Sequence, residues 1–219
     1  MKAFIFDFNG TLFQDTPMHL YAWREFFRRH GVTVTDEAFY KYMCGPPNTA
    51  ILARFLGDHL SDAQVAALSE EKENLYRQVI LDDPALQVLT PGAAEMLDHL
   101  KSAGIPHAIA TGADKGNMDF YMKVLGVGRW FDYDHIFCAH RGLPGKPDPA
   151  IYRLAMDRLG YAPAETVVVE DALAGIQSAL GAGVQTVVAI DTTLGRDAFA
   201  GIPEVRAVVH DFLDYRAFI

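Results

Sequence analysis

Residues 5–11 of the chain read IFDFNGT. An apolar run ends at the carboxylate of Asp7, and after one intervening residue comes Asn9-Gly10, one of the strongest short signals for a turn. The pattern predicts a buried strand that ends at Asp7. In open parallel sheets, ligands bind beyond the carboxyl ends of the strands. Asp7 is therefore a candidate site residue, although most Asp residues before turns are solvated or cap a helix.

The composition indicates a globular protein and excludes several classes of partner. The chain has 219 residues, half of them hydrophobic, enough to bury a substantial core in one large domain or in a domain with a small insertion. It carries 19 Lys plus Arg against 28 Asp plus Glu, a formal net charge of -9. Nucleic acid and anionic membrane surfaces are therefore poor partners.

The cysteines and the apolar runs indicate the compartment. Cys44 and Cys138 are far apart and form no Cys-x-x-Cys pair, so neither a disulfide framework nor a thiolate metal site is predicted. Asp7 interrupts the first apolar stretch, and no run approaches the roughly 18 apolar residues of a membrane span. We expect a cytoplasmic protein without a signal peptide.

Short apolar runs alternate with helical patterns along most of the chain. Strands are predicted at 3–8, 106–111, 135–139, 166–170, 185–190 and 205–210, and helices at 93–103, 117–125, 150–159 and 172–180. This alternation predicts an α/β fold, a Rossmann-like parallel sheet with helices on both faces.

The alternation stops after the first strand. Helical patterns follow one another at 17–30, 36–43, 48–56 and 61–80, with turn residues at both edges, DTP at 15–17 and DDP at 82–84. So long a segment without structure would be implausible, whereas four helices make a small bundle. We expect an α/β core domain of residues 1–13 and 85–219 and an inserted four-helix cap domain of residues 14–84. Such a cap would close a pocket over Asp7.

Polar groups also follow the ends of other predicted strands. They are Thr111-Gly112 after the second strand, Lys146 in the stretch GKPDP at 145–149 after the third, and Glu170-Asp171 at the end of the fourth. Because the carboxyl ends of parallel strands meet at one edge of a sheet, these groups should converge on Asp7. Taken singly, each has an ordinary explanation; the acid pair, for example, would suit a helix N-terminus.

Three carboxylates, a hydroxyl and an ammonium around one point suit a divalent cation together with a phosphoryl group. Mg2+ prefers oxygen ligands and completes its shell with waters and substrate phosphate. Lys146 would balance negative charge, and Thr111 with backbone amides would hold phosphoryl oxygens. The sequence thus predicts Mg2+ as cofactor and a small phosphorylated metabolite as partner.

The chain closely resembles the haloacid dehalogenase-like superfamily, and within it the group with a small helical cap that includes beta-phosphoglucomutase and many sugar-phosphate phosphatases. The matching stretches are FDFNGTL at 6–12, DTPMH at 15–19 with Ala22-Trp23, TPGA at 90–93, GKPDP at 145–149 and VEDALAGI at 169–176, so the resemblance covers essentially the whole chain. It implies that Asp7 is a nucleophile that forms an aspartyl-phosphate. It further implies that Asp7, the backbone carbonyl of Asn9 and Asp171 hold Mg2+, and that Glu170 assists directly or through water.

Asn9 departs from the family pattern. The family has Asp at this position, where the carboxyl protonates the leaving oxygen and then activates the water that releases the phosphoryl group. An amide can do neither, although its backbone carbonyl is unaffected. Loss of a positioned acid/base costs about 10²–10⁴-fold in rate, while phosphate ester hydrolysis can be accelerated by up to about 10²¹. We expect a phosphohydrolase of reduced efficiency, or one restricted to good leaving groups.

Besides the catalytic and metal-binding candidates, three residues are candidates for substrate binding: His19, Lys72 and Gly112. His19 could bring its imidazole over the pocket as a substitute acid, or it could merely order the hinge. Lys72 falls where the family's cap lysine lies, although a Lys amid neighbouring Glu residues is also typical of a solvated ion pair. A further possibility is that Asn9-Gly10 deamidates to Asp.

Other reactions and roles fit the residues less well. The cap segment GPPN at 45–48 lacks the Arg with which phosphoglucomutases grip a second phosphate, and it offers Asn48 where phosphonatases need a Lys. Dehalogenases use no metal, so the acid pair Glu170-Asp171, which suits a metal, speaks against a dehalogenase. The alternative that the protein binds phosphate without catalysis stays open. The aromatic residues of the first cap helix, Tyr21, Trp23, Phe26 and Phe27, are predicted to form the bundle core rather than a substrate stack. A monomer is the default for this group.

Overall fold

The computed structural model describes residues 2–138 and 142–219. Contacts among the residues divide it into two compact units, Met1–Gln14 with Val88–Ile219, here called the sheet unit, and Asp15–Gln87, here called the helical unit. The sequence analysis places the boundaries after residues 13 and 84. That the two units are domains in their own right stays a prediction, and each is described by itself.

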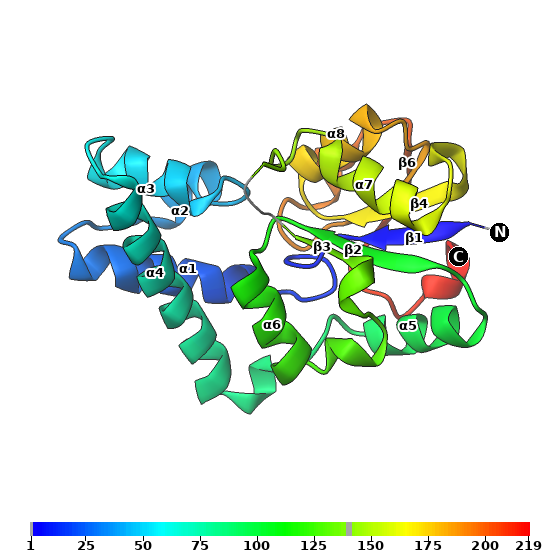
Figure 1. The fold of residues 1–219 in the computed structure, drawn as a ribbon, viewed down its shortest axis with the longest axis horizontal. Helices are drawn as coiled ribbons and strands as arrows, with labels where there is room; N and C mark the ends of the chain where they lie inside the picture. Colours follow the sequence, from blue (N-terminus) through cyan, green and yellow to red (C-terminus); the bar gives the residue numbers. More distant parts are fainter. Residues whose placement is uncertain (1, 139–141) are drawn as a thin grey trace. The chain divides into compact units, whose positions relative to one another are not determined.

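A parallel sheet organises the sheet unit. Within the described residues it has six strands in the order β3-β2-β1-β4-β5-β6 (Figure 1). Their bounds are β1 (Ala3–Phe6), β2 (His107–Thr111), β3 (Ile136–Cys138), β4 (Thr166–Glu170), β5 (Thr186–Ile190) and β6 (Val205–Val209). All neighbouring pairs are parallel, which confirms the predicted α/β fold. Ala139, the last residue of the predicted third strand, lies outside the described residues.

Helices cover both faces of the sheet. They are α5 (Ala93–Ser102), α6 (Lys115–Val124), α7 (Ala150–Leu159) and α8 (Leu173–Gly181); α7 and α8 lie on one side and α5 and α6 on the other (Figure 1). On the first side Ile5 and Val168 of the sheet share a buried cluster with Tyr152 of α7 and Ile176 of α8. Strands buried on both faces read as continuous apolar runs rather than alternating ones, which is what the sequence shows.

Short 3-10 turns connect the larger elements. They are η1 (Pro84–Leu86), η2 (Val127–Arg129), η3 (Tyr133–His135), η4 (Pro163–Glu165), η5 (Arg196–Phe199) and η6 (Tyr215–Ala217).

The position of β1 inside the sheet determines where Asp7 lies. Phe6 pairs with Ile109 of β2 on one side and with Val169 of β4 on the other, so Asp7 emerges between the ends of two neighbouring strands.

The helical unit consists, in the described residues, of four helices and the turn η1. The helices are α1 (Thr16–Arg29), α2 (Asp36–Tyr42), α3 (Asn48–Leu56) and α4 (Asp62–Asp82). Two begin at capped residues: the Thr35 side chain accepts a hydrogen bond from the Ala38 backbone N–H, and Ser61 forms a capping box with Gln64. The helices enclose an apolar cluster of Trp23, Phe26, Phe27, Val34, Phe39, Met43, Ile51 and Leu52.

The aromatic residues of α1 confirm one part of the prediction and correct another. Trp23, Phe26 and Phe27 are buried in the bundle core, where the Trp23 and Phe27 rings stack and the Phe26 ring meets both edge-on. Tyr21 is 57% exposed, so its assignment to the core was wrong. The reason is helical periodicity: a residue two positions before Trp23 points to the opposite side of α1.

Across the part of the chain that the structure describes, no helix is both long enough and apolar enough to pass through a membrane.

The core of the helical unit gives a stability prediction. The Phe27 ring is fully buried, with its centroid 5.2 Å from that of Trp23 and 5.1 Å from that of Phe55. Phe27→Ala should lower the free energy of unfolding by about 3–5 kcal/mol, because it removes apolar contacts and leaves a cavity. Urea unfolding measures this, with Tyr21→Ala on the exposed side of α1 as the matched control, expected within about 0.5 kcal/mol of the parent. Equal losses in the two variants would contradict the packing described.

Candidate active site

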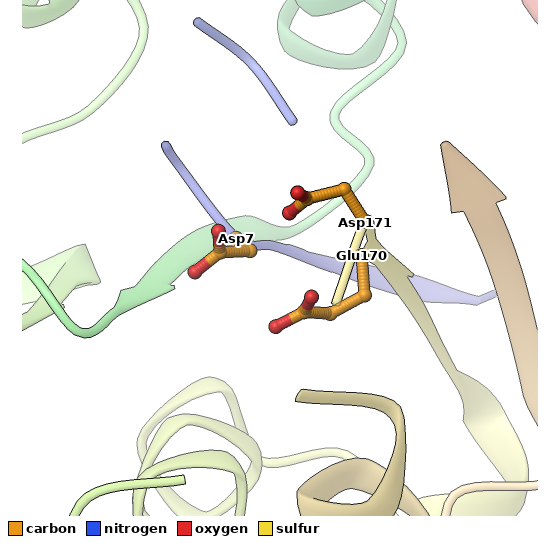
Figure 2. A group of neighbouring side chains, drawn as sticks. All are labelled: Asp7, Glu170 and Asp171. Carbon is orange, nitrogen blue, oxygen red and sulfur yellow. The ribbon is translucent and has the colours of Figure 1, made fainter. Parts of the chain in front are cut away.

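Three buried carboxylates meet at the carboxyl edge of the sheet. Asp7 follows β1, and Glu170 and Asp171 stand at the end of the adjacent β4, with the Glu170 and Asp171 side chains turned toward Asp7 (Figure 2). One oxygen of each carboxylate lies within 4.8 Å of one oxygen of each of the others. Their exposed fractions are 8%, 1% and 6%. The structure therefore brings together the acids that the sequence placed at separate strand ends.

Lys146 lies between two of these acids. Its Nζ donates to Asp7 Oδ1 at 2.7 Å, to Glu170 Oε1 at 2.6 Å and to the Ala110 carbonyl at 2.9 Å. The Tyr152 hydroxyl also donates to Glu170 Oε1, at 3.1 Å, and the Ala172 backbone N–H donates to Oε2 at 2.9 Å. Both oxygens of Glu170 thus accept hydrogen bonds from the protein, and its contacts fix it as the ion-pair partner of Lys146.

Two threonines orient Asp171. Thr11 Oγ1 donates to Asp171 Oδ1 at 3.2 Å, and Thr193 Oγ1 donates to Oδ2 at 3.1 Å. Thr192 Oγ1 donates to the Gly10 carbonyl at 3.0 Å. The sequence analysis missed Thr192 and Thr193, although they stand just beyond the predicted strand at 185–190. Applying the strand-end argument to that strand as well would have found them.

Two glycines make room for the carboxylates. Gly10 has a φ of +76°, and a Cβ there would lie 2.2 Å from Asp171 Oδ2. A Cβ on Gly175 would lie 1.6 Å from Glu170 Oε1. Both distances are far below van der Waals contact, so any side chain at these positions would displace an acid of the site.

The crowding of like charges alters the proton affinity of the site. Burial raises the pKa of Asp7 from 3.8 to about 7; Lys146 opposes this increase and Glu170 adds to it. Burial, followed by the charges of Glu170 and Asp7, raises the pKa of Asp171 well above its ordinary value. Burial lowers the pKa of Lys146, but Asp7 and Glu170 more than offset this and hold it well above its ordinary value. The site is therefore short of positive charge.

Asn9 and Thr111 lie together beside the acids. Thr111 Oγ1 donates to Asn9 Oδ1 at 3.4 Å and accepts from the Ala113 backbone N–H at 3.1 Å. Asn9 Nδ2 donates to the hydroxyl of Tyr121 at 2.8 Å. Gly112 follows directly after β2 and is exposed. Tyr121 was not singled out from the sequence, because nothing in the helical pattern of 117–125 relates it to residue 9.

His19 and Lys72 meet within the helical unit. Lys72 Nζ lies 2.8 Å from His19 Nδ1 and donates to Glu73 Oε1 at 2.9 Å, while His19 Nε2 lies 3.3 Å from Asp15 Oδ2. Lys72 is 1% exposed, so the alternative of a solvated ion pair is wrong: the pair with Glu73 is buried. Glu73, which the sequence analysis did not single out, also accepts from Asn48 Nδ2 at 2.7 Å.

Comparison with known proteins identifies the family. Residues 1–183 match the sequence profile of haloacid dehalogenase-like hydrolases. The chain is 36% identical over 183 residues to hexitol phosphatase A of Escherichia coli strain K12, covering 83% of this chain and 80% of that protein.

Two solved structures share the fold over nearly the whole chain. A HAD hydrolase, family IA, variant 3, from Entamoeba histolytica has a TM-score of 0.88 at 34% identity and covers 98% of this chain and 95% of its own. An aspartate-to-asparagine mutant of CbbY from Rhodobacter sphaeroides was solved in complex with xylulose-1,5-bisphosphate. It has a TM-score of 0.81 at 26% identity, and the match covers 97% of this chain and 95% of the CbbY chain. The chain belongs to the haloacid dehalogenase-like hydrolase family.

Proposed function

We propose that the protein is a Mg2+-dependent phosphohydrolase that removes the phosphoryl group of a small phosphorylated metabolite through an aspartyl-phosphate at Asp7. The observation that carries the proposal is the Asp7 carboxylate, held by the Lys146 ammonium at 2.7 Å and grouped with Glu170 and Asp171. A carboxylate oriented by a cation in a buried site is an arrangement suited to nucleophilic attack on phosphorus.

The relatives suggest the substrate class. One is named a hexitol phosphatase, and one structural neighbour was solved in complex with a sugar bisphosphate. We therefore propose a phosphorylated sugar or sugar alcohol as the substrate. His19, Lys72 and Gly112 remain the proposed substrate-binding residues, with Lys72 supplying a buried positive charge.

The acids fit a hard divalent cation. Asp7 and Asp171 offer carboxylate oxygens close together, their raised pKa values indicate a shortage of positive charge, and Mg2+ prefers such oxygen ligands. With the backbone carbonyl of Asn9 they would hold the ion. Glu170, whose oxygens already accept hydrogen bonds from Lys146, Tyr152 and Ala172, would assist through water. When bound, Mg2+ would neutralise charge on the phosphoryl oxygens.

The reaction then divides into two displacements at phosphorus. An Asp7 oxygen forms a bond to phosphorus while the bond to the leaving oxygen breaks, and that oxygen departs with the electron pair. Water then attacks phosphorus, gives a proton to bulk solvent, and releases inorganic phosphate as the bond between phosphorus and the Asp7 oxygen breaks and the Asp7 carboxylate is restored. Lys146 limits rotation of the Asp7 carboxylate, which reduces the cost of orientation. Thr111 has a single hydroxyl hydrogen, which Asn9 Oδ1 accepts in the structure, so Thr111 would have to turn this donor away from Asn9 to hold a phosphoryl oxygen.

The amide of Asn9 restricts this chemistry. It cannot give a proton to the leaving oxygen or take one from the attacking water. Leaving groups that are stable as anions, such as the carboxylate of an acyl phosphate, should therefore depart readily, whereas a sugar alkoxide should depart slowly. Asn9 would equally suit a protein that binds phosphate without turning it over, so trapping of Asp7 by beryllofluoride with Mg2+ distinguishes the two functions.

Substrates that differ in leaving group test the role of Asn9. With Mg2+, the parent protein should hydrolyse acetyl phosphate and p-nitrophenyl phosphate faster than a hexitol phosphate. Asn9→Asp should raise kcat on the hexitol phosphate by about 10²–10⁴-fold, because it restores a proton donor, and should change acetyl phosphate turnover far less. Asp7→Asn is the control and should abolish all three activities. Equal rates on the three substrates, unchanged by Asn9→Asp, would refute this account.

The raised pKa of Asp7 predicts how stability depends on pH. The folded protein binds the Asp7 proton at a pKa of about 7, against 3.8 for the ordinary group. The resulting stabilisation is complete below the lower value and is lost as the pH rises through the higher one. Without divalent cations, Tm should therefore fall between about pH 4 and about pH 7, and Mg2+ should raise it again at the upper end because it binds the folded protein.

Thermal unfolding of variants isolates this contribution. Asp7→Asn should lose much of the fall in Tm over this range and much of the Mg2+ response. The matched control, Asp119→Asn, replaces an exposed carboxylate on α6 and should behave as the parent does. If Asp7→Asn and Asp119→Asn gave the same pH dependence, Asp7 would not carry the shifted proton.

A further inference from the structure

The hydroxyl of Tyr121 is a buried polar group that the reaction above does not use. Tyr121 lies on α6 and is fully buried. Its ring stacks on Phe8, with centroids 4.6 Å apart and an interplanar angle of 24°, and meets the Phe13 ring edge-on at 5.8 Å. These two aromatic neighbours hold the ring and thereby restrict the position of the hydroxyl.

The side chain of Asn9 is held at both ends of its amide. Nδ2 donates to Tyr121 Oη at 2.8 Å, and Oδ1 accepts from Thr111 Oγ1 at 3.4 Å. The Thr111 hydroxyl accepts in turn from the Ala113 backbone N–H at 3.1 Å. Because the amide is planar, these two contacts set its rotation and decide which end faces α6.

We propose that Tyr121 is a positioning residue that sets the orientation of the Asn9 amide for phosphoryl transfer. The inference rests on the proposed function of the site. An amide nitrogen carries two hydrogens, and once the Tyr121 oxygen engages one of them, planarity fixes the direction of the other. Asn9 then acts as a hydrogen-bond donor of fixed direction at the position where the family uses an acid. A donor held in place stabilises developing charge on the leaving oxygen without transferring a proton.

Kinetics on a hexitol phosphate test the positioning role. Tyr121→Phe keeps the ring that packs on Phe8 and removes only the hydroxyl. It should lower kcat by roughly 2- to 12-fold, the equivalent of one hydrogen bond, with KM changed less than kcat. Tyr215→Phe, which removes a hydroxyl from another buried tyrosine of the sheet unit, is the matched control and should leave both constants unchanged.

A double-mutant cycle separates positioning from a merely structural effect. If Tyr121 acts through the Asn9 amide, Tyr121→Phe should have no further effect on kcat once Asn9→Ala has removed that amide. An undiminished effect in the Asn9→Ala background would show that Tyr121 acts by another route and would overturn the proposal.

Deamidation of Asn9-Gly10 gives a readout that does not depend on activity. In this reaction the Gly10 backbone nitrogen attacks Cγ of Asn9, the side-chain nitrogen leaves as ammonia, and water opens the resulting imide to aspartate or isoaspartate. The contacts to Tyr121 and Thr111 oppose the rotation that this attack needs, and the Gly10 N–H is itself held by the Phe13 carbonyl at 2.7 Å. At mildly alkaline pH, Tyr121→Phe should deamidate several-fold faster than the parent or Tyr215→Phe, as measured by peptide mass spectrometry.

The two readouts distinguish failure of the inference from failure of the proposed function. An active parent whose kcat and deamidation rate are both unaffected by Tyr121→Phe would overturn the positioning role and leave the phosphohydrolase intact. A parent inactive on every phosphate tested would overturn the function and the positioning role together, even if Tyr121→Phe deamidates faster. An active parent in which Tyr121→Phe lowers kcat and accelerates deamidation would support both.

Discussion

The ammonium of Lys146 stands between two buried carboxylates, and the geometry of the whole site depends on it. It binds Asp7 at 2.7 Å and Glu170 at 2.6 Å. Burying an unpaired carboxylate is costly, and a single cation cannot compensate three of them, so the pKa values of Asp7 and Asp171 remain raised. The same shortage of positive charge supports the proposal that this site binds a divalent cation.

The parallel sheet supplies the precision that this chemistry requires. Because β1 lies between β2 and β4, Asp7 emerges beside the strand ends that carry Thr111 on one side and Glu170 on the other. Neighbouring segments add supporting contacts: Tyr152 on α7 donates to Glu170, and Thr193, in the turn after β5, donates to Asp171. Side chains fixed by packing and by such outer contacts keep their geometry when a ligand binds.

Much of this could be predicted from sequence, because strand ends and helix periods leave local patterns. The α/β fold and the convergence of Asp7, Lys146 and Asp171 needed only apolar runs followed by polar residues. Contacts between distant elements leave no such pattern, which is why Tyr121 was missed. Thr193 does follow a predicted strand end, and it was missed because the strand-end argument was not applied there. Local chemistry also shifts boundaries: α6 begins at Lys115, two residues earlier than predicted, because Asp114 caps it by accepting from the Asn117 backbone N–H. Tyr21 was misassigned because its helix face was not considered.

The close approach of Asp171 to Gly10 has a consequence for how the protein ages. Asparagine followed by glycine is chemically fragile, and the ordinary remedy is to replace the glycine with a bulkier residue. Gly10 cannot be replaced in this way, because the Cβ of any other residue at position 10 would lie 2.2 Å from Asp171 Oδ2 and collide with that carboxylate. The durability of this molecule over time must then come from the neighbours that restrain Asn9 rather than from the residue that follows it.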